Sequence, residues 1–304
     1  MAAEPTPIAF MVGARRLFAV ERRLATMAFS LEDALAKAPP PAPEDVARLD
    51  GIRVLSAPQA MAERIAASYP EHVLGAREDF RRHYIAMDGS FEDYLGRFSG
   101  KTRSTLRRKA KKFAQADGGT LDVRAYTTAD EVEGFLELAL PLSERTYQAR
   151  LLDAGLPDSE AARTAMLDGA AAGRMRCFLL FLKGEPVAYL SLPVHGDTLV
   201  YAHLGYDPQH ASLSPGTVLQ MEALRMLFAE DRFRFFDFTE GEGAHKALFG
   251  THSVACCSFV LLRRTFANRA LLGARDGFDA LVAGAKALTE NGGSLASARK
   301  LLKA

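Results

Sequence analysis

Three apolar, β-prone segments follow one another in the middle of the chain, with only short turns between them. They cover residues 177–182, 186–194 and 198–206, and a glycine stands in each intervening turn, at 183–185 and 195–197. Segments of this length joined by such tight turns pair most readily with their sequence neighbours. The pattern predicts an antiparallel meander of three strands, and it constrains the fold more than any other feature of the sequence.

A helix and a further strand follow the meander. Residues 214–217, Ser-Pro-Gly-Thr, open an amphipathic helix that we expect to reach residue 229, and residues 233–238 are apolar enough for a strand. The start of a helix presents unpaired N–H groups and a partial positive charge, and proline suits its first turn. A pyrophosphate site fits this start, but the same four residues also make an ordinary helix cap.

The N-terminal part predicts helices and a linker. Apolar residues recur every three or four positions over residues 8–37, which predicts two amphipathic helices, the second of them capped by Ser30 and Asp33. The proline-rich run at 38–43 cannot continue a helix, so residues 1–45 form an arm and a linker. Such an arm packs on its own domain, on a second subunit of an oligomer, or in a membrane interface.

The other flanking segments mix strands and helices. Residues 46–98 read as short strands alternating with helices, and a strand at 121–126 precedes two helices at 130–150 and 158–172. An amphipathic helical tail is expected over residues 266–304. Like the N-terminal arm, the tail packs on its own domain, on a second subunit of an oligomer, or in a membrane interface.

Overall charge and cysteine content exclude several classes of protein. Lysine and arginine number 38 against 37 acidic residues, so the net charge of +1 argues against a dedicated DNA-binding protein. Cys177, Cys256 and Cys257 have neither disulfide-framework nor metal-ligand spacing. Arginines interrupt the apolar residues near the N-terminus, so we expect no signal peptide or membrane span. We expect a cytoplasmic protein that needs no metal, with peripheral attachment to the inner face of the membrane as an alternative.

One predicted helix, at residues 101–116, has a strongly basic side. It carries seven basic side chains and no acidic partner among them, and their mutual repulsion disfavours a merely solvated face. The alternatives are a solvated face, a groove for an anionic substrate and a surface for anionic lipid headgroups. The candidate substrate-binding residues on this helix are Lys101, Arg103, Arg107 and Arg108.

Four stretches of the chain resemble one known family. They are residues 91–113, 182–219, 233–250 and the Arg-Arg pair with the helix after residue 262. In this order they resemble the GNAT acyltransferases, and within them the cellulose-biosynthesis-type acetyltransferases, which are related to the Fem-type aminoacyl transferases. The chain departs from ordinary GNAT enzymes in having Leu-Ser-Pro-Gly-Thr in place of their glycine-rich pyrophosphate signature. It also has His245 where the family commonly has an aromatic residue.

The resemblance implies an α/β (α+β) GNAT fold with a mixed central sheet that is splayed between the strands at 198–206 and 233–238. The acyltransferase domain would cover residues 99–265, preceded by a truncated GNAT-like half at 46–98 and flanked by the amphipathic terminal helices. It further implies acyl-CoA as the donor, bound where the strands part. The expected donor-binding residues are Leu204, Ser214, Pro215, Gly216, Thr217 and Val218.

Acyl transfer to an amine requires a group that removes the proton of the ammonium form. By alternation we expect His203 on the same side of its strand as Tyr201 and Gly205, facing one cleft with Asp237 at the end of the next strand. A half-buried structural histidine is the alternative for His203. A cap for the following loop is the alternative for Asp237.

Further candidates lie in the glycine-spaced loop at residues 240–246 and at the end of a strand. Glu240 and His245 are alternative bases, and the resemblance implies that Lys246 compensates charge at the thioester carbonyl or at a phosphate. Tyr206 is placed to protonate the leaving thiolate. The structural alternative for Lys246 is an ordinary surface lysine, and the structural alternative for Tyr206 is a tyrosine packed in the core.

The expected reaction is therefore transfer of an acyl group from acyl-CoA to a primary amine. The terminal amphipathic segments and the 19 phenylalanines lean toward a long-chain, sphingoid-type amine and an N-acyl lipid such as a ceramide. N-acetylation of an amino sugar in envelope polysaccharide synthesis is an alternative. A non-catalytic nucleotide-binding module and an aminoacyl-tRNA-dependent transferase also stay open.

Overall fold

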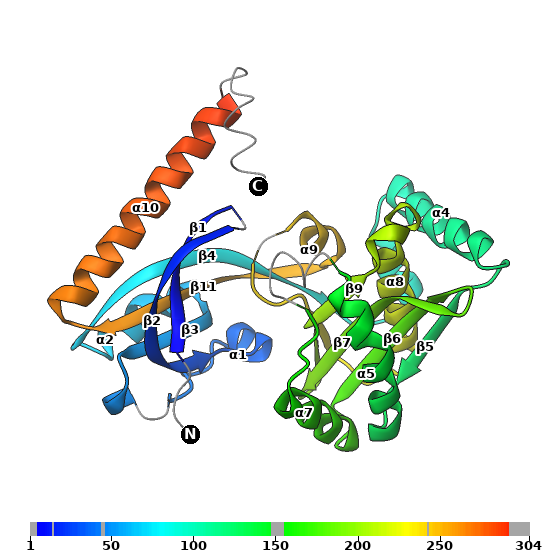
Figure 1. Ribbon diagram of the computed structural model, residues 1–304, viewed down its shortest axis with the longest axis horizontal. Coiled ribbons are helices and arrows are strands. Elements are labelled where there is room, and N and C mark those ends of the chain that lie inside the picture. Colours follow the sequence, from blue (N-terminus) through cyan, green and yellow to red (C-terminus); the bar gives the residue numbers. More distant parts are fainter. Residues whose placement is uncertain (1–4, 14, 44–45, 147–154, 242, 292–304) are drawn as a thin grey trace. The chain divides into compact units, whose positions relative to one another are not determined.

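The computed structural model describes residues 5–13, 15–43, 46–146, 155–241 and 243–291. The chain forms two compact units (Figure 1), of which the first joins Met1–Arg82 to Val254–Ala304 and the second is His83–Ser253. Each unit contains part of a mixed sheet with helices packed against it. Among the described helices, none combines the length and apolar character needed to cross a membrane.

The sheet of the first unit has the strand order β1-β2-β3-β11-β4. Its antiparallel pairs are β1 with β2 and β3 with β11, while β2 and β3 run parallel. The strands are β1 (Pro5–Val12), β2 (Arg15–Ala28), β3 (Gly51–Pro58), β4 (His72–Ala86) and β11 (His252–Arg263). The ends of β4 and β11 that belong to the second unit take part in its structure instead.

The first of the two helices predicted over residues 8–37 is wrong, because β1 and β2 occupy this segment. Ile8 and Phe10 are both buried and lie two residues apart, which is the spacing of a strand. A register shift between Phe10 and Met11 interrupts the alternation of the hairpin. When the alternation is interrupted, apolar residues recur at spacings of three and four, which imitate a helix. The pairing of β2 with β3 favours a strand over a helix for this segment.

The second predicted N-terminal helix is confirmed as α1 (Leu31–Ala36), and Ser30 with Asp33 forms the expected capping box. The other helical elements of this unit are η1 (Val46–Arg48), η2 (Gln59–Met61), α2 (Ala62–Ala67) and α10 (Phe266–Asn291). Helix α10 accounts for the described part of the predicted tail, and residues 292–304 lie outside the described residues. Phe278 of α10 packs edge-on against Phe10, with ring centroids 5.5 Å apart.

The sheet of the second unit has the order β4-β10-β8-β7-β6-β5, with β9 also paired to β7. The strands are β5 (Asp122–Tyr126), β6 (Met175–Leu182), β7 (Glu185–His195), β8 (Thr198–Val200), β9 (His203–Tyr206) and β10 (Phe235–Asp237). Strand β6 is antiparallel to β7, and β7 is antiparallel to both β8 and β9. The predicted meander and the mixed α/β fold are confirmed.

Helices cover both faces of this sheet (Figure 1). Alternate residues of β6 point to opposite faces, with Phe178 and Leu180 in one apolar core and Cys177 and Leu179 in the other. Helices α5 (Ala129–Glu144) and α7 (Glu160–Ala171) close the second core. The first core is closed by α3 (Phe91–Gly96), α4 (Gly100–Ala116), α8 (Pro215–Ala229) and α9 (Ala244–Phe249).

The single strand expected over residues 198–206 is broken into β8 and β9. Along β7, Leu199 lies opposite Val194, whereas His203 lies opposite Ser191, so the register shifts by one residue between the two strands. Sequence alternation cannot show such a shift, because it depends on the partner strand. The shift changes which side chains of the segment share a face.

The predicted splay lies at this break. Strand β8 runs parallel to β10, and the backbone N–H of Tyr201 continues the pairing with a 2.9 Å hydrogen bond to the carbonyl oxygen of Asp237. Beyond that bond β9 follows β7, while β10 ends at Asp237. The two strands therefore part, and among the described strands none pairs with the other edge of β9.

Candidate active site

The start of α8 has an unusual backbone. A 3-10 helix, η3 (Pro208–Leu213), leads into it, and Ser214 has a left-handed conformation with φ of 55°. The Ser214 side chain makes no capping hydrogen bond, so this start is not the ordinary cap that the sequence left open. Val218 N donates to Ser214 O at 3.1 Å, whereas the earlier N–H groups of Gly216 and Thr217 have no carbonyl within their own helix to bond. Such a start favours an anion.

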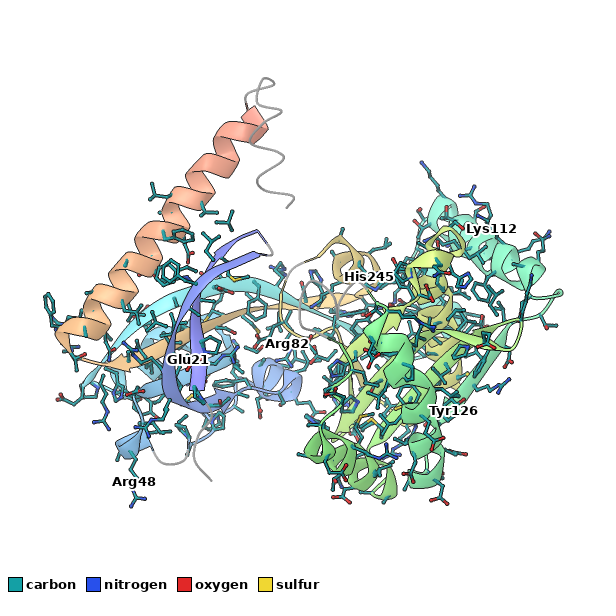
Figure 2. All side chains as sticks on the ribbon, viewed as in Figure 1. Glu21, Arg48, Arg82, Lys112, Tyr126 and His245 are labelled. Atoms are coloured by element: carbon teal, nitrogen blue, oxygen red, sulfur yellow. The ribbon has the colours of Figure 1, made fainter. Side chains whose placement is uncertain are left out.

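Two lysines of α4 lie at the start of α8. Lys109 Nζ donates to Thr217 Oγ1 at 3.4 Å, and Lys112 Nζ donates to the carbonyl oxygen of Ser212 at 2.9 Å. Figure 2 shows Lys112 on α4, the helix that packs against α8. The two lysines were recognised as part of the basic helix but not as site residues, although their spacing of three already placed them on one helical face.

Gly216 packs tightly against β9. A Cβ atom at this position would lie 3.1 Å from Leu204 Cδ2 and 3.2 Å from Tyr206 Cδ1. Leu204 and Tyr206 therefore share the face of β9 that meets α8. Two of the remaining expected donor residues, Pro215 and Val218, are buried in the same helix start.

His203 lies on the opposite face of β9, so its expected placement beside Tyr201 is wrong. It alternates with Leu204 and shares its face with Gly205, where a Cβ atom would meet the ring of Tyr189 at 2.5 Å. Tyr201 lies before the register shift and packs on the α8 side, with its ring 5.4 Å from that of Phe238. Burial lowers the pKa of His203.

Asp237, Glu240 and Lys246 make local contacts. Asp237 is completely buried, and its Oδ1 accepts a 2.9 Å hydrogen bond from Thr239 N, as expected of a residue that shapes the following loop. Lys246 Nζ donates to the backbone carbonyl oxygen of Glu240. These contacts hold the loop at residues 240–246 in place, apart from Glu242, which lies outside the described residues.

His245 has the most distinctive environment of the candidate bases. It lies on α9 (Figure 2), and its Nε2 is 2.7 Å from Oε1 of Gln220 on α8. Its ring centroid lies 4.7 Å from that of Phe249 and 6.3 Å from that of Tyr201, the residue at the splay. Burial lowers the pKa of His245, and the charges of Lys109 and Lys246 lower it further, so the imidazole is neutral at neutral pH.

Gln220 was missed by the sequence analysis. Its side chain is fully buried, and its Nε2 has no hydrogen-bond partner in the described part of the chain, although burial of an unpaired amide is unfavourable. The available signal was a glutamine between Leu219 and Ala223, which are both buried on the core-facing side of α8. A polar residue at such a position indicates a specific polar partner, and that partner is His245.

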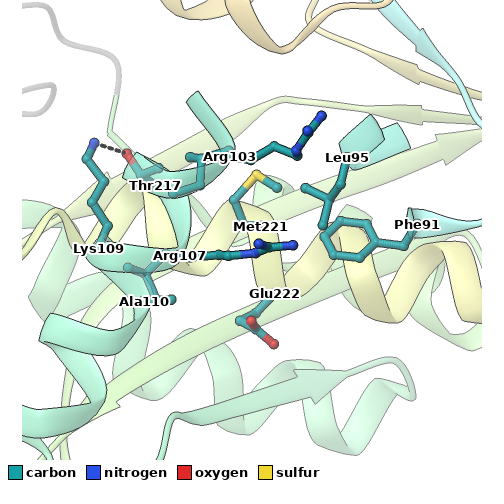
Figure 3. Close-up of a pocket in the computed structure, with 11 residues that line it drawn as sticks. Phe91, Leu95, Arg103, Arg107, Lys109, Ala110, Thr217, Met221 and Glu222 are labelled. Carbon is teal, nitrogen blue, oxygen red and sulfur yellow. Dashed lines mark hydrogen bonds between the residues drawn. The ribbon is translucent and has the colours of Figure 1, made fainter. Parts of the chain in front are cut away.

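The predicted substrate-binding residues of α4 divide into two groups. Arg103 is used structurally, because its Nη1 donates to the carbonyl oxygens of Gly96 at 3.1 Å and Phe98 at 2.6 Å. Lys101, Arg107 and Arg108 are exposed and have no hydrogen-bond or ion-pair partner among the described residues. Of these three, Arg107 lines a pocket between α3, α4 and α8 (Figure 3).

Comparisons with known proteins find one matching family model and several solved structures of similar fold. Residues 100–247 match the family described as acetyltransferase (GNAT) domain. The structure of FemX aligns with a TM-score of 0.52 at 11% identity, over 84% of this chain and 87% of that chain. The structure of L-PGS from Bacillus licheniformis aligns with a TM-score of 0.47 at 14% identity, over 74% of this chain and 72% of that chain. A GCN5-related N-acetyltransferase from Kribbella flavida aligns with a TM-score of 0.37 at 11% identity, over 72% of this chain and 71% of that chain. At these identities the likeness to FemX concerns the fold alone, and no curated protein matches the sequence.

Proposed function

We propose that this chain, whose residues 100–247 match the family described as acetyltransferase (GNAT) domain, is an acyltransferase that moves an acyl group from acyl-CoA to a primary amine. The observation that carries the proposal is the start of α8. There an uncapped helix end, the left-handed Ser214 and the cations of Lys109 and Lys112 come together. Unpaired N–H groups and two ammonium groups fit the pyrophosphate of CoA.

The proposed reaction needs one base and one polarising group. The neutral amine attacks the thioester carbonyl, a C–N bond forms, the C–S bond breaks, and the CoA thiolate takes up a proton. The edge of β9 beyond Tyr201, which pairs with none of the described strands, supplies backbone N–H groups that stabilise the negative charge on the carbonyl oxygen. Tyr206, on the α8 face of β9, is the proposed proton donor to the thiolate.

We assign the base to His245 rather than to His203 or Asp237. His245 is on the α8 side with Tyr201, Lys109 and the donor helix, and its lowered pKa keeps the imidazole in the form that accepts a proton. His203 faces the other core, and Asp237 is buried with a loop N–H as a partner. Lys246 follows the proposed base in the sequence, and we assign it the compensation of negative charge at the thioester carbonyl or at a phosphate.

The acceptor is a primary amine, and exposed apolar side chains of the first unit favour a lipid-like one. Leu17, Phe18, Phe266 and Leu281 are each at least half exposed. The amphipathic N-terminal helix that first suggested a lipid amine is absent from residues 5–13 and 15–28, so this preference now rests on these side chains. An amino sugar is the competing acceptor.

Calorimetric titration with acetyl-CoA and palmitoyl-CoA, the latter below its micelle-forming range, tests the donor. Both lysine contacts are removed in Lys109→Met/Lys112→Met, and Lys111→Met is the matched control on the same helix. We expect the wild type and the control to bind, and the double variant to lose about tenfold or more in affinity, the usual effect of losing charge-assisted hydrogen bonds. If the double variant bound acyl-CoA as tightly as the wild type, the assignment of the phosphate site to Lys109 and Lys112 would be wrong.

Release of CoA then separates the acceptors. Release with a long-chain amine but not with glucosamine supports a lipid amine, and the reverse result supports an amino sugar. Binding of charged tRNA with a steep salt dependence, in the absence of acyl-CoA binding, would overturn the acyl-CoA donor in favour of aminoacyl-tRNA. Binding of nucleotides without CoA release for any amine would overturn catalysis itself.

A further inference from the structure

A pocket between α3, α4 and α8 has an apolar floor. We call it the α4–α8 groove, and it has a volume of about 100 Å³. Its apolar lining residues are Phe91, Leu95, Leu106, Ala110, Val218 and Met221. Figure 3 shows Phe91, Leu95, Ala110 and Met221 around this pocket, and in this view Met221 lies between Arg103 and Arg107. An apolar pocket with a few charged groups at its border suits a flat, partly apolar ligand.

The charged residues of the groove leave it positive. Arg107 is exposed and has no hydrogen-bond or ion-pair partner in the described part of the chain, and Lys109 meets only a neutral hydroxyl there, that of Thr217. The anionic lining residue is Glu222, whose Oε2 is paired with Arg225 Nε at 2.9 Å. Arg107 is thus an available guanidinium at the border of an apolar pocket, and guanidinium binds phosphate by two parallel hydrogen bonds.

The groove is continuous with the start of α8. Thr217 belongs to the first turn of α8, accepts the hydrogen bond of Lys109 and also lines the groove. From there the groove extends along α8 to Met221 and along α4 to Arg107. If the phosphates of a ligand bind at the first turn of α8, the part of the ligand next to those phosphates therefore reaches the α4–α8 groove.

We propose that the α4–α8 groove receives the 3′-phosphoadenosine end of CoA, with Arg107 binding the 3′-phosphate and the adenine resting on the apolar floor. The proposal rests on the proposed donor and extends it, because it names the residue that distinguishes CoA from its dephosphorylated form. The chemistry matches on both sides. A flat aromatic base meets Leu106 and Met221, and a phosphate dianion meets a guanidinium that has no partner among the residues the structure describes.

Titration of CoA and of dephospho-CoA, which lacks only the 3′-phosphate, tests the proposal by binding alone. The wild type should bind CoA about ten- to a hundredfold more tightly than dephospho-CoA, the range of a charge-assisted bidentate contact. In Arg107→Gln the two ligands should bind with equal affinity, close to that of dephospho-CoA for the wild type. Lys111→Gln, which removes an exposed charge of α4 outside the groove, should keep the discrimination.

Each other outcome has a distinct meaning. Equal binding of both ligands by the wild type, or discrimination that survives in Arg107→Gln, overturns the assignment of the groove while the proposed donor stands. Absence of binding for both ligands overturns the proposed donor and the groove together. A Met221→Trp variant, which fills the groove, should weaken both ligands, and unchanged binding in this variant would place the adenine elsewhere.

Discussion

Gln220 Oε1 and His245 Nε2 lie 2.7 Å apart and join the donor helix α8 to α9. Because the glutamine oxygen accepts, the neutral imidazole carries its proton on Nε2 and keeps the lone pair on Nδ1. The contact therefore fixes both the tautomer and the orientation of the ring. It also links the helix proposed to hold the donor to α9, which carries the proposed base.

Replacing His245 should lower kcat far more than replacing His203. We expect His245→Gln to lower kcat by about a hundred- to ten-thousandfold, the usual contribution of general base catalysis. His203→Gln should cost less than about tenfold, because His203 faces the core closed by α5 rather than the α8 side. Steady-state CoA release with an accepted amine measures both. A larger loss for His203→Gln would reverse the assignment of the base.

The acid limb of the pH–rate profile should report the pKa of His245. Burial and the charges of Lys109 and Lys246 lower this pKa, so the neutral base persists below the ordinary pKa of histidine, and activity falls as pH drops through the lowered value. Lys109→Met removes one of the two charges. The pKa should rise, and the acid limb of kcat at saturating acyl-CoA should move to higher pH. Lys111→Met is the control, and an unmoved limb in Lys109→Met would contradict the assignment.

Gln220→Met separates a positioning role from a structural one. The substitution removes a buried amide whose Nε2 is unpaired, so the free energy of unfolding should change by no more than about 1 kcal/mol. The rate kcat should nevertheless fall, because His245 loses the partner that holds its tautomer. Gln220→Glu should instead raise the pKa of His245 and shift the acid limb to higher pH. Urea unfolding and the pH–rate profile measure these effects, and loss of stability with normal kcat would show a purely structural role.

Much of the fold was predictable because its signals are local. The meander from β6 to β9 follows from apolar segments joined by tight turns, and the capping box at Ser30 marks a true helix start. The basic helix α4 and the start of α8 were also read correctly from neighbouring residues. In each case the residues that decide the structure lie within a few positions of one another.

The missed features depend on partners distant in sequence. Strand β2 forms because it pairs with β3, and β3 in turn pairs with β11, which comes about 200 residues later. The register shift before His203 needs β7 as its reference, so the sequence placed His203 on the wrong face. Gln220 and His245 are 25 positions apart, and nothing local in either segment indicates their contact.

The packing behind β9 provides a test of the fold that is independent of catalysis. A Cβ atom on Gly205 would lie 2.5 Å from Tyr189 Cε1 and 2.6 Å from its hydroxyl. The ring cannot move aside easily, because Tyr189 is completely buried and its hydroxyl is 2.9 Å from Ser143 Oγ, which also accepts from Leu156 N at 2.8 Å. Gly205→Ala should therefore lower the free energy of unfolding by about 1–3 kcal/mol, the usual cost of overpacking a core.

The matched control for Gly205→Ala is Gly134→Ala in α5, where nothing lies within 4 Å of the added Cβ. A glycine in the interior of a helix costs about 0.5–1 kcal/mol relative to alanine, so this variant should be more stable than the wild type. In urea unfolding, the changes in the free energy of unfolding should have opposite signs for the two variants if contact with Tyr189 requires a glycine at position 205. A stable Gly205→Ala would mean that β9 can move away from the Tyr189 ring, and the face assigned to His203 would then lose its support.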